Sequence, residues 1–221
     1  MDAESWETSS GDLFRMVLAL SPIRLARTKA GKRKLRLFGV GCARLFWDAI
    51  PDDRLKHGVE LAERVADGLE SRQALEEVHS DLRYSHAAGR IREPEEWHWV
   101  VAKLAIGCCD VKANDVALNS IGFESMPIPA DRRRVLTFRS DLLRCIFGNP
   151  FQKPAFSKKW RSETVTALAT GIYEEHAFDR LPILADALEE AGCDEPTMLS
   201  HLRGPGPHCR GCWVLDLALG K

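Results

Sequence analysis

Residues 178–193 read FDRLPILADALEEAGC and contain the complete pattern of one helix. Asp179 stands where a side chain can cap the first turn, and Gly192 stands where a helix ends. Between them the apolar residues recur at the spacing of one helical face: Leu181, Leu184, Ala185 and Leu188. The pattern predicts an amphipathic helix with its apolar face buried.

The same spacing extends through most of the chain. Apolar residues recur at three- and four-residue intervals over residues 35–49, 59–69 and 165–173. Strand signals are nearly absent, because no Asn-Gly or Asp-Gly turn lies between alternating runs. We therefore expect an all-α, compact multi-helix protein with about eight to ten helices.

Two segments rich in glycine and proline divide this helical pattern. Residues 121–130 contain Gly122, Pro127 and Pro129 and indicate a linker, and Gly148–Pro150 ends a long helical segment. We expect a larger N-terminal helical part, residues 1–146, and a C-terminal helical subdomain, residues 147–221, which includes the Gly-Pro-Gly-Pro turn at 204–207. The two parts form one domain or two packed subdomains.

The composition is that of a folded protein without a strong electrostatic bias. The 221 residues are 45% hydrophobic and 29% charged, and the formal net charge is -1, so the molecule as a whole is not attracted to nucleic acid or membranes. The N-terminus lacks an apolar signal segment, and no apolar run reaches the roughly 20 residues that span a bilayer. Seven cysteines, mostly in apolar segments, favour reduced thiols. We expect a cytoplasmic protein without a membrane partner.

Four segments carry a resemblance to a known family: Lys32–Phe38 (KRKLRLF), Phe147–Phe151 (FGNPF), Phe178–Leu188 (FDRLPILADAL) and Arg210–Trp213 (RGCW). In this order they resemble an uncharacterised helical domain family that is common in large planctomycete genomes, especially those of Gemmata-type bacteria. The resemblance spans most of the chain. It implies a bacterial source and a soluble helical domain, and it implies no catalytic activity. The related segments have an aliphatic residue at the position of Cys209.

The C-terminal turn carries a Cys-x-x-Cys pair, Cys209 and Cys212. Two thiolates at this spacing can bind one tetrahedral zinc ion, and Cys193, His201 or His208 can complete the ligand set. The candidate zinc ligands are therefore Cys209, Cys212, His208 and Cys193. A second clear ligand pair, which zinc modules normally have, is missing. The alternatives are a redox dithiol or cysteines that serve packing alone.

The segment from Phe14 to Trp47 contains nine basic residues and no acidic one. On a helix that begins near Lys32, one face gathers three arginines and a tryptophan: Arg33, Arg36, Arg44 and Trp47. Such a face can bind a phosphate backbone, with the tryptophan stacked on a base. It can equally meet an acidic protein partner, or the chain's own acidic stretch from Asp52 to Glu96.

No combination of nucleophile, base and oxyanion donor is apparent in the sequence. We therefore expect a non-enzymatic helical module that binds a protein partner, an interpretation that the six tryptophans favour. A zinc-binding module at the Cys-x-x-Cys pair and a nucleic-acid binder at the basic face are the alternative functions.

Overall fold

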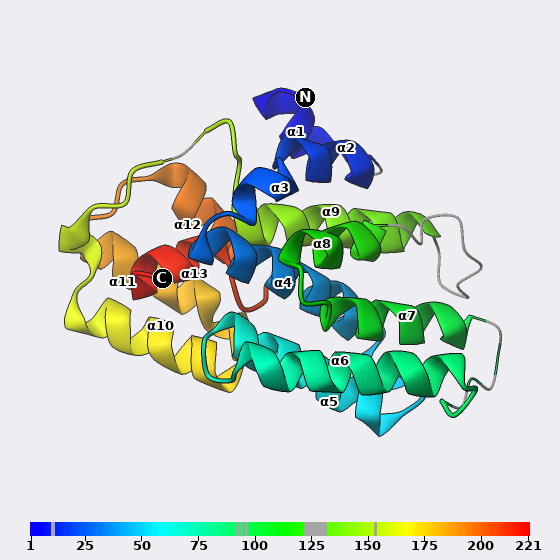
Figure 1. Ribbon diagram of the computed structural model, residues 1–221. Helices are drawn as coiled ribbons and strands as arrows, with labels where there is room; N and C mark the ends of the chain where they lie inside the picture. Colours follow the sequence, from blue (N-terminus) through cyan, green and yellow to red (C-terminus); the bar gives the residue numbers. More distant parts are fainter. Residues whose placement is uncertain (10–11, 92, 94, 96, 122–131, 153) are drawn as a thin grey trace. The chain divides into compact units, whose positions relative to one another are not determined.

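The computed structural model describes residues 1–9, 12–91, 93, 95, 97–121, 132–152 and 154–221 (Figure 1). Throughout these residues the chain forms helices, turns and loops, without a strand. The prediction of an all-α, compact multi-helix fold is therefore confirmed. The expected linker falls largely on residues 122–131, which lie outside the described residues.

The chain divides into two compact units. The N-terminal unit comprises Met1 and Ser9–Ser140, and the C-terminal unit comprises Asp2–Thr8 and Asp141–Lys221. The boundary at Ser140 falls inside helix α9 (Arg132–Phe147). The sequence pattern instead places the boundary after residue 146, at the end of that helix.

The N-terminal unit is built around α4 (Lys29–Arg44), which packs against α5 (Asp53–Ala66), α7 (His98–Cys108) and α8 (Ala113–Ile121). The remaining helices of this unit are α2 (Leu13–Ala19), α3 (Pro22–Leu25) and α6 (Arg72–Ala87), and the 3-10 turn η1 spans Trp47–Ala49. The short helices at the N-terminus are absent from the sequence prediction, because four to seven residues are too few to repeat an apolar period.

Helix α4 is buried on most of its circumference because small residues let its neighbours approach closely. A Cβ atom at Gly39 would lie only 2.3 Å from Cγ1 of Val116 on α8. Gly58 on α5 likewise sits against α6, since a Cβ there would be 2.8 Å from Cδ1 of Leu82. The core of the unit fills the space between these helices with aliphatic side chains such as Val40, Leu55 and Val101.

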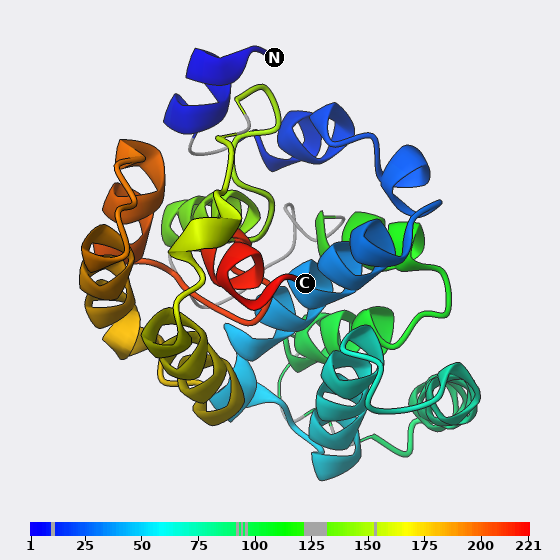
Figure 2. The ribbon, with the colours of Figure 1, turned by 90° about the vertical axis from the view of Figure 1, so that its left-hand side faces the viewer.

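The C-terminal unit contains α10 (Glu163–Glu175), α11 (Leu181–Glu190), α12 (Pro196–Arg203) and α13 (Trp213–Leu219), with the 3-10 turns η2 (Lys158–Trp160) and η3 (Phe178–Arg180). Helix α13, red in Figure 2, packs against α10 and α12, and α11 packs against both α10 and α12. Their apolar faces form one core, to which Leu184, Leu188 and Val214 contribute.

The helix at residues 181–190 forms as its apolar spacing predicts, and its buried face includes Leu181, Leu184, Ala185 and Leu188. It ends before Gly192, whose φ is 87°. The prediction that Asp179 caps it is wrong. Residues 178–180 form η3, so Arg180 takes the N-cap position without a side-chain hydrogen bond. Pro182 in the first turn has no N–H group to be capped.

Helix α1 (Ala3–Thr8) belongs to the C-terminal unit although the rest of that unit begins at Asp141. Arg144 on α9 donates from Nε and Nη2 to the carbonyl oxygen of Trp6, at 2.9 Å and 2.7 Å. The Nδ2 group of Asn149 donates to Oε1 of Glu7 at 2.9 Å. These bonds tie the first helix to residues that follow the whole N-terminal unit. Among the described residues, no helix is long and apolar enough to cross a membrane.

Candidate metal centre

Four potential metal ligands gather within the C-terminal unit: Cys145, His201, His208 and Cys212. Their ligand atoms all lie within 4.8 Å of one another. The Nε2 atom of His201 is 3.3 Å from Sγ of Cys212, and Nδ1 of His208 is 3.8 Å from Sγ of Cys145. Both cysteines are buried and both histidines are half-buried, so the group is largely shielded from water.

The two histidines are placed by α12 and by the turn that follows it. Glu195 caps α12 through the backbone N–H of Thr197, and His201 lies in the last turn of that helix. The chain then reverses through the Gly-Pro-Gly-Pro turn. At Gly206, φ is 84° and a Cβ would lie 2.9 Å from the backbone nitrogen of His208, so only glycine fits there without strain.

The ring of His208 is oriented by a backbone contact. Its Nε2 lies 3.2 Å from the carbonyl oxygen of Gly204. Because a carbonyl only accepts, this contact requires a proton on Nε2, which leaves Nδ1 in a neutral ring with a free lone pair facing Cys145. A hydrogen bond from the second ring nitrogen to a carbonyl is a common feature of histidines that bind metals.

The two cysteines come from parts of the chain far apart in sequence. Cys145 lies in the last turn of α9, and Cys212 is the N-cap residue of α13. A turn closed by a 3.1 Å hydrogen bond from the N–H of Cys212 to the carbonyl of Cys209, with Gly211 at φ 88°, directs Cys212 into the group. The fold rather than local spacing therefore assembles these ligands.

Burial controls the protonation of the two thiols. It raises the pKa of Cys212 to about 11, and the neighbouring Cys145 thiol adds to this effect. Contact with the Cys209 thiol, together with burial, raises the pKa of Cys145 well above its usual range. Two adjacent buried thiolates repel each other and are poorly solvated, so a cation is needed to hold both in the ionised form.

The arrangement fits a tetrahedral zinc ion. Zinc–sulfur bonds of about 2.3 Å and zinc–nitrogen bonds of about 2.0 Å require ligand atoms about 3.3–3.8 Å apart. The distances from His201 to Cys212 and from His208 to Cys145 are 3.3 Å and 3.8 Å. The two ligand atoms that are farthest apart are no more than 4.8 Å from each other, so a small inward movement of the side chains would bring all four to zinc-binding distance.

The structure brings together two of the four expected zinc ligands, His208 and Cys212. Cys209 is half-buried beside Cys145 and lies outside the group of four. Cys193 follows α11 and is packed into the apolar core of the unit. The group of four contains Cys145 and His201 instead of these two cysteines. No local spacing connects Cys145 to the Cys-x-x-Cys pair, whereas His201 is one of the residues that the sequence offers to complete the set.

The basic face expected on α4 is largely paired inside the N-terminal unit. Arg33 donates from Nε to Asp67 at 2.9 Å, and Nη2 of Arg44 donates to Glu63 at 2.8 Å. Both carboxylates belong to the acidic stretch between Asp52 and Glu96. These two arginines therefore bind the chain's own acidic residues, which is one of the alternatives that the sequence left open.

Arg36 and Trp47 are also engaged within the unit. The guanidinium of Arg36 is buried and its Nη1 donates to the carbonyl oxygens of Cys108 and Asp110, at 2.9 Å and 2.8 Å. It thereby binds carbonyl groups at the C-terminal end of α7 and just after it. The guanidinium of Arg44 lies over the ring of Trp47, with its Cζ atom 4.8 Å from the ring centroid. The four residues therefore do not form an open phosphate-binding face, because each has a partner inside the fold.

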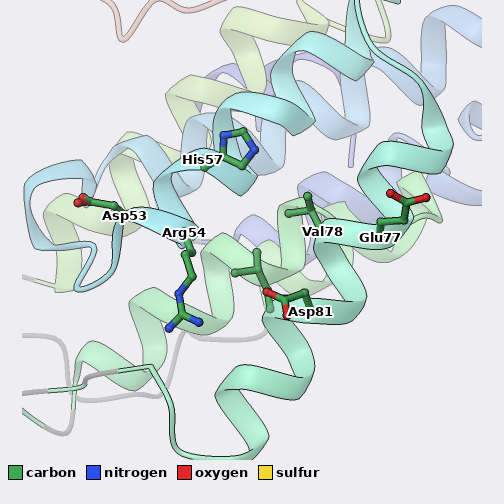
Figure 3. A pocket seen from close by; sticks show the side chains of 7 residues that line it. Asp53, Arg54, His57, Glu77, Val78 and Asp81 are labelled. Carbon is green, nitrogen blue, oxygen red and sulfur yellow. The ribbon is translucent and has the colours of Figure 1, made fainter.

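An open groove between α5 and α6 is lined by Asp53, Arg54, His57, Glu77, Val78, Asp81 and Leu82 (Figure 3). Its charged groups already have neighbours: Arg54 binds Asp52 at 2.7 Å, and Glu77 accepts from Gln73 at 3.1 Å. Figure 3 shows Asp53 and Glu77 on opposite sides of the groove, pointing apart. These side chains do not converge on a common point, as catalytic groups must.

Comparison of the chain with protein-family models, with curated proteins and with solved structures finds no match.

Proposed function

We propose that the C-terminal unit is a zinc-binding helical module, with Cys145, His201, His208 and Cys212 as the four ligands. The observation that supports this is the convergence of four ligand atoms within 4.8 Å in a shielded site. The ligands come from α9, α12, the following turn and the start of α13, so the bound ion would connect these three helices.

The ligand chemistry favours zinc over other metals. Two thiolates and two imidazoles in a tetrahedral arrangement suit Zn²⁺, whereas Mg²⁺ and Ca²⁺ prefer oxygen ligands. Four protein ligands leave no coordination position for water or substrate, which is the pattern of structural rather than catalytic zinc. The ion's role would then be to stabilise the unit, and its charge would hold the two cysteines as thiolates.

A structural zinc site agrees with a non-enzymatic role for the whole chain. Zinc sites with four protein ligands are common in small recognition modules, which they hold in a fixed shape. We therefore propose that the module binds a protein partner.

Metal analysis of the purified, reduced protein tests this proposal. We expect about one zinc per chain, and tetrahedral Co²⁺ spectra with thiolate charge-transfer absorption after exchange. Cys145→Ser and Cys212→Ser should lose the metal. Cys193→Ser is the matched control, because Cys193 is also a buried cysteine of the same unit but lies outside the group, and it should keep the metal. A wild-type protein that binds no zinc even when zinc is added would refute the proposal.

A further inference from the structure

Four basic side chains at the junction of α3 and α4 are exposed: Arg24, Arg27, Lys29 and Lys32. Within the part of the chain that the structure describes, none of these side chains makes a hydrogen bond or an ion pair. They differ in this respect from Arg33, Arg36 and Arg44, which are paired inside the N-terminal unit. We call the four residues the α3–α4 corner.

The corner is held rigidly by contacts between the two helices. A Cβ at Gly31 would lie 2.1 Å from the carbonyl oxygen of Leu25, so the first turn of α4 rests directly on the end of α3. Thr28 joins them, since its Oγ1 donates to the carbonyl of Leu25 at 3.1 Å and accepts from the N–H of Gly31 at 2.9 Å. The four cations are thereby carried by one fixed piece of backbone.

The charges at this corner are unfavourable for the isolated fold. Lys29 and Lys32 lie in the first turn of α4, where the helix dipole is positive and acidic residues are preferred. The sequence offers no local compensation, because no acidic residue occurs between Phe14 and Trp47. A polyanion bound at the corner would relieve both the mutual repulsion and the interaction with the dipole.

We propose that the α3–α4 corner binds the phosphate backbone of nucleic acid. Lysine, arginine and threonine side chains at a rigid helix start are typical phosphate contacts, and they fix the backbone without reading the sequence. A partner protein is a weaker fit, because protein interfaces have an apolar centre and this corner consists of charged and polar side chains. The site lies in the N-terminal unit, so it does not depend on the proposed metal centre.

Four phosphate contacts predict a definite salt dependence. The slope of log K against log salt should be about -3 to -4 for duplex DNA and slightly smaller for single strands. The affinity should be weak, with a Kd of about 10⁻⁴–10⁻⁶ M near physiological salt, and should vary little with base sequence.

Fluorescence anisotropy with labelled single-stranded and duplex oligonucleotides tests the proposal, from about 50 to 200 mM salt. The variant R24Q/R27Q/K29Q/K32Q should bind at least about tenfold more weakly and lose most of the salt slope. The control R83Q/K112Q/K158Q/K159Q removes the same charge from four exposed positions elsewhere and should bind nearly as the wild type.

Equal loss in both variants would mean that net charge alone is responsible, and it would overturn the proposal. So would the absence of binding at low salt, or binding to anionic lipid vesicles without binding to oligonucleotides. Circular dichroism should give the same spectrum for the two variants. The Tm of R24Q/R27Q/K29Q/K32Q should be at least that of the control, because the substitutions remove the mutual repulsion and the unfavourable interaction with the helix dipole. If the quadruple variant is unfolded, the pair K29Q/K32Q should still reduce the salt slope by about 2.

Discussion

The Nε2 atom of His208 lies 3.2 Å from the carbonyl oxygen of Gly204, at the other end of the Gly-Pro-Gly-Pro turn. The turn therefore does more than reverse the chain between α12 and α13. It supplies the acceptor that fixes the tautomer of His208, and its Gly206 gives the ring the space in which it lies. Metal binding should then depend on glycines that are not themselves ligands.

Gly206→Ala should weaken zinc binding by about 10–100-fold, the usual effect of disturbing a residue that orients a ligand. The added Cβ would lie 2.9 Å from the backbone of His208 and would displace its ring. Gly192→Ala is the control, because φ is similar, 87°, and no described residue lies within 4 Å of the added Cβ. Competition with a chromophoric chelator measures both affinities. An equal loss in the two variants would show that backbone strain, rather than the position of His208, is responsible.

Removal of zinc should lower the Tm of the wild-type protein. A ligand present at about 1,000 times its Kd stabilises the folded state by about 4 kcal/mol, and a chelator removes that contribution. Cys145→Ser should have the lower Tm from the start and should not respond to the chelator. Thermal denaturation with and without chelator measures this, and a wild-type Tm that is unchanged by the chelator would contradict it.

Arg36→Met should destabilise the N-terminal unit by about 3 kcal/mol, because it leaves one buried and one partly buried carbonyl group without this donor. The carbonyl oxygens of Cys108 and Asp110 lose bonds of 2.9 Å and 2.8 Å. Arg83→Met is the control on an exposed position of α6, where the expected change is within about 0.5 kcal/mol. Urea unfolding measures the free energies. Similar values for the two variants would mean that Arg36 contributes no more than a surface charge.

Gly39→Ala and Gly171→Ala should have opposite effects on stability. At Gly39 the new Cβ would lie 2.3 Å from Cγ1 of Val116, and such overpacking costs about 1–3 kcal/mol. At Gly171, inside α10, no described residue is within 4 Å, so alanine should stabilise the helix by about 0.5–1 kcal/mol. The double variant G39A/V116A should recover part of the loss. Stabilisation by Gly39→Ala alone would refute the close approach of α4 and α8.

The sequence predicts the helices that are long enough to show a period. The helix at residues 181–190 and its end before Gly192 follow from apolar spacing and one glycine. Helices α1, α2 and α3 are too short for such a signal, and they form because tertiary contacts hold them. Local spacing also leads to Cys212 and His208, which one turn brings together.

Cys145 could not be predicted as a candidate ligand, because its distance from Cys212 is set by the core in which both cysteines are packed. The arginines of α4 are a second case in which the sequence does not determine the contacts of a side chain. Their charge is visible in the sequence, but whether a charge faces solvent or a carboxylate depends on where α5 lies. Arg33 and Arg44 bind Asp67 and Glu63 at the C-terminal half of α5, whereas the exposed cations of the α3–α4 corner lie nearer the start of the basic segment.

The bonds from Arg144 to the carbonyl of Trp6 have a consequence for the order of synthesis. Helix α1 leaves the ribosome long before Arg144 and Asn149, the residues after Ser140 that bind it. The N-terminal unit can therefore fold before Arg144 and Asn149, which bind residues 2–8, have been synthesised. The C-terminal unit is completed only when both of its segments are present, so the proposed metal site would form only after Cys212 has been synthesised.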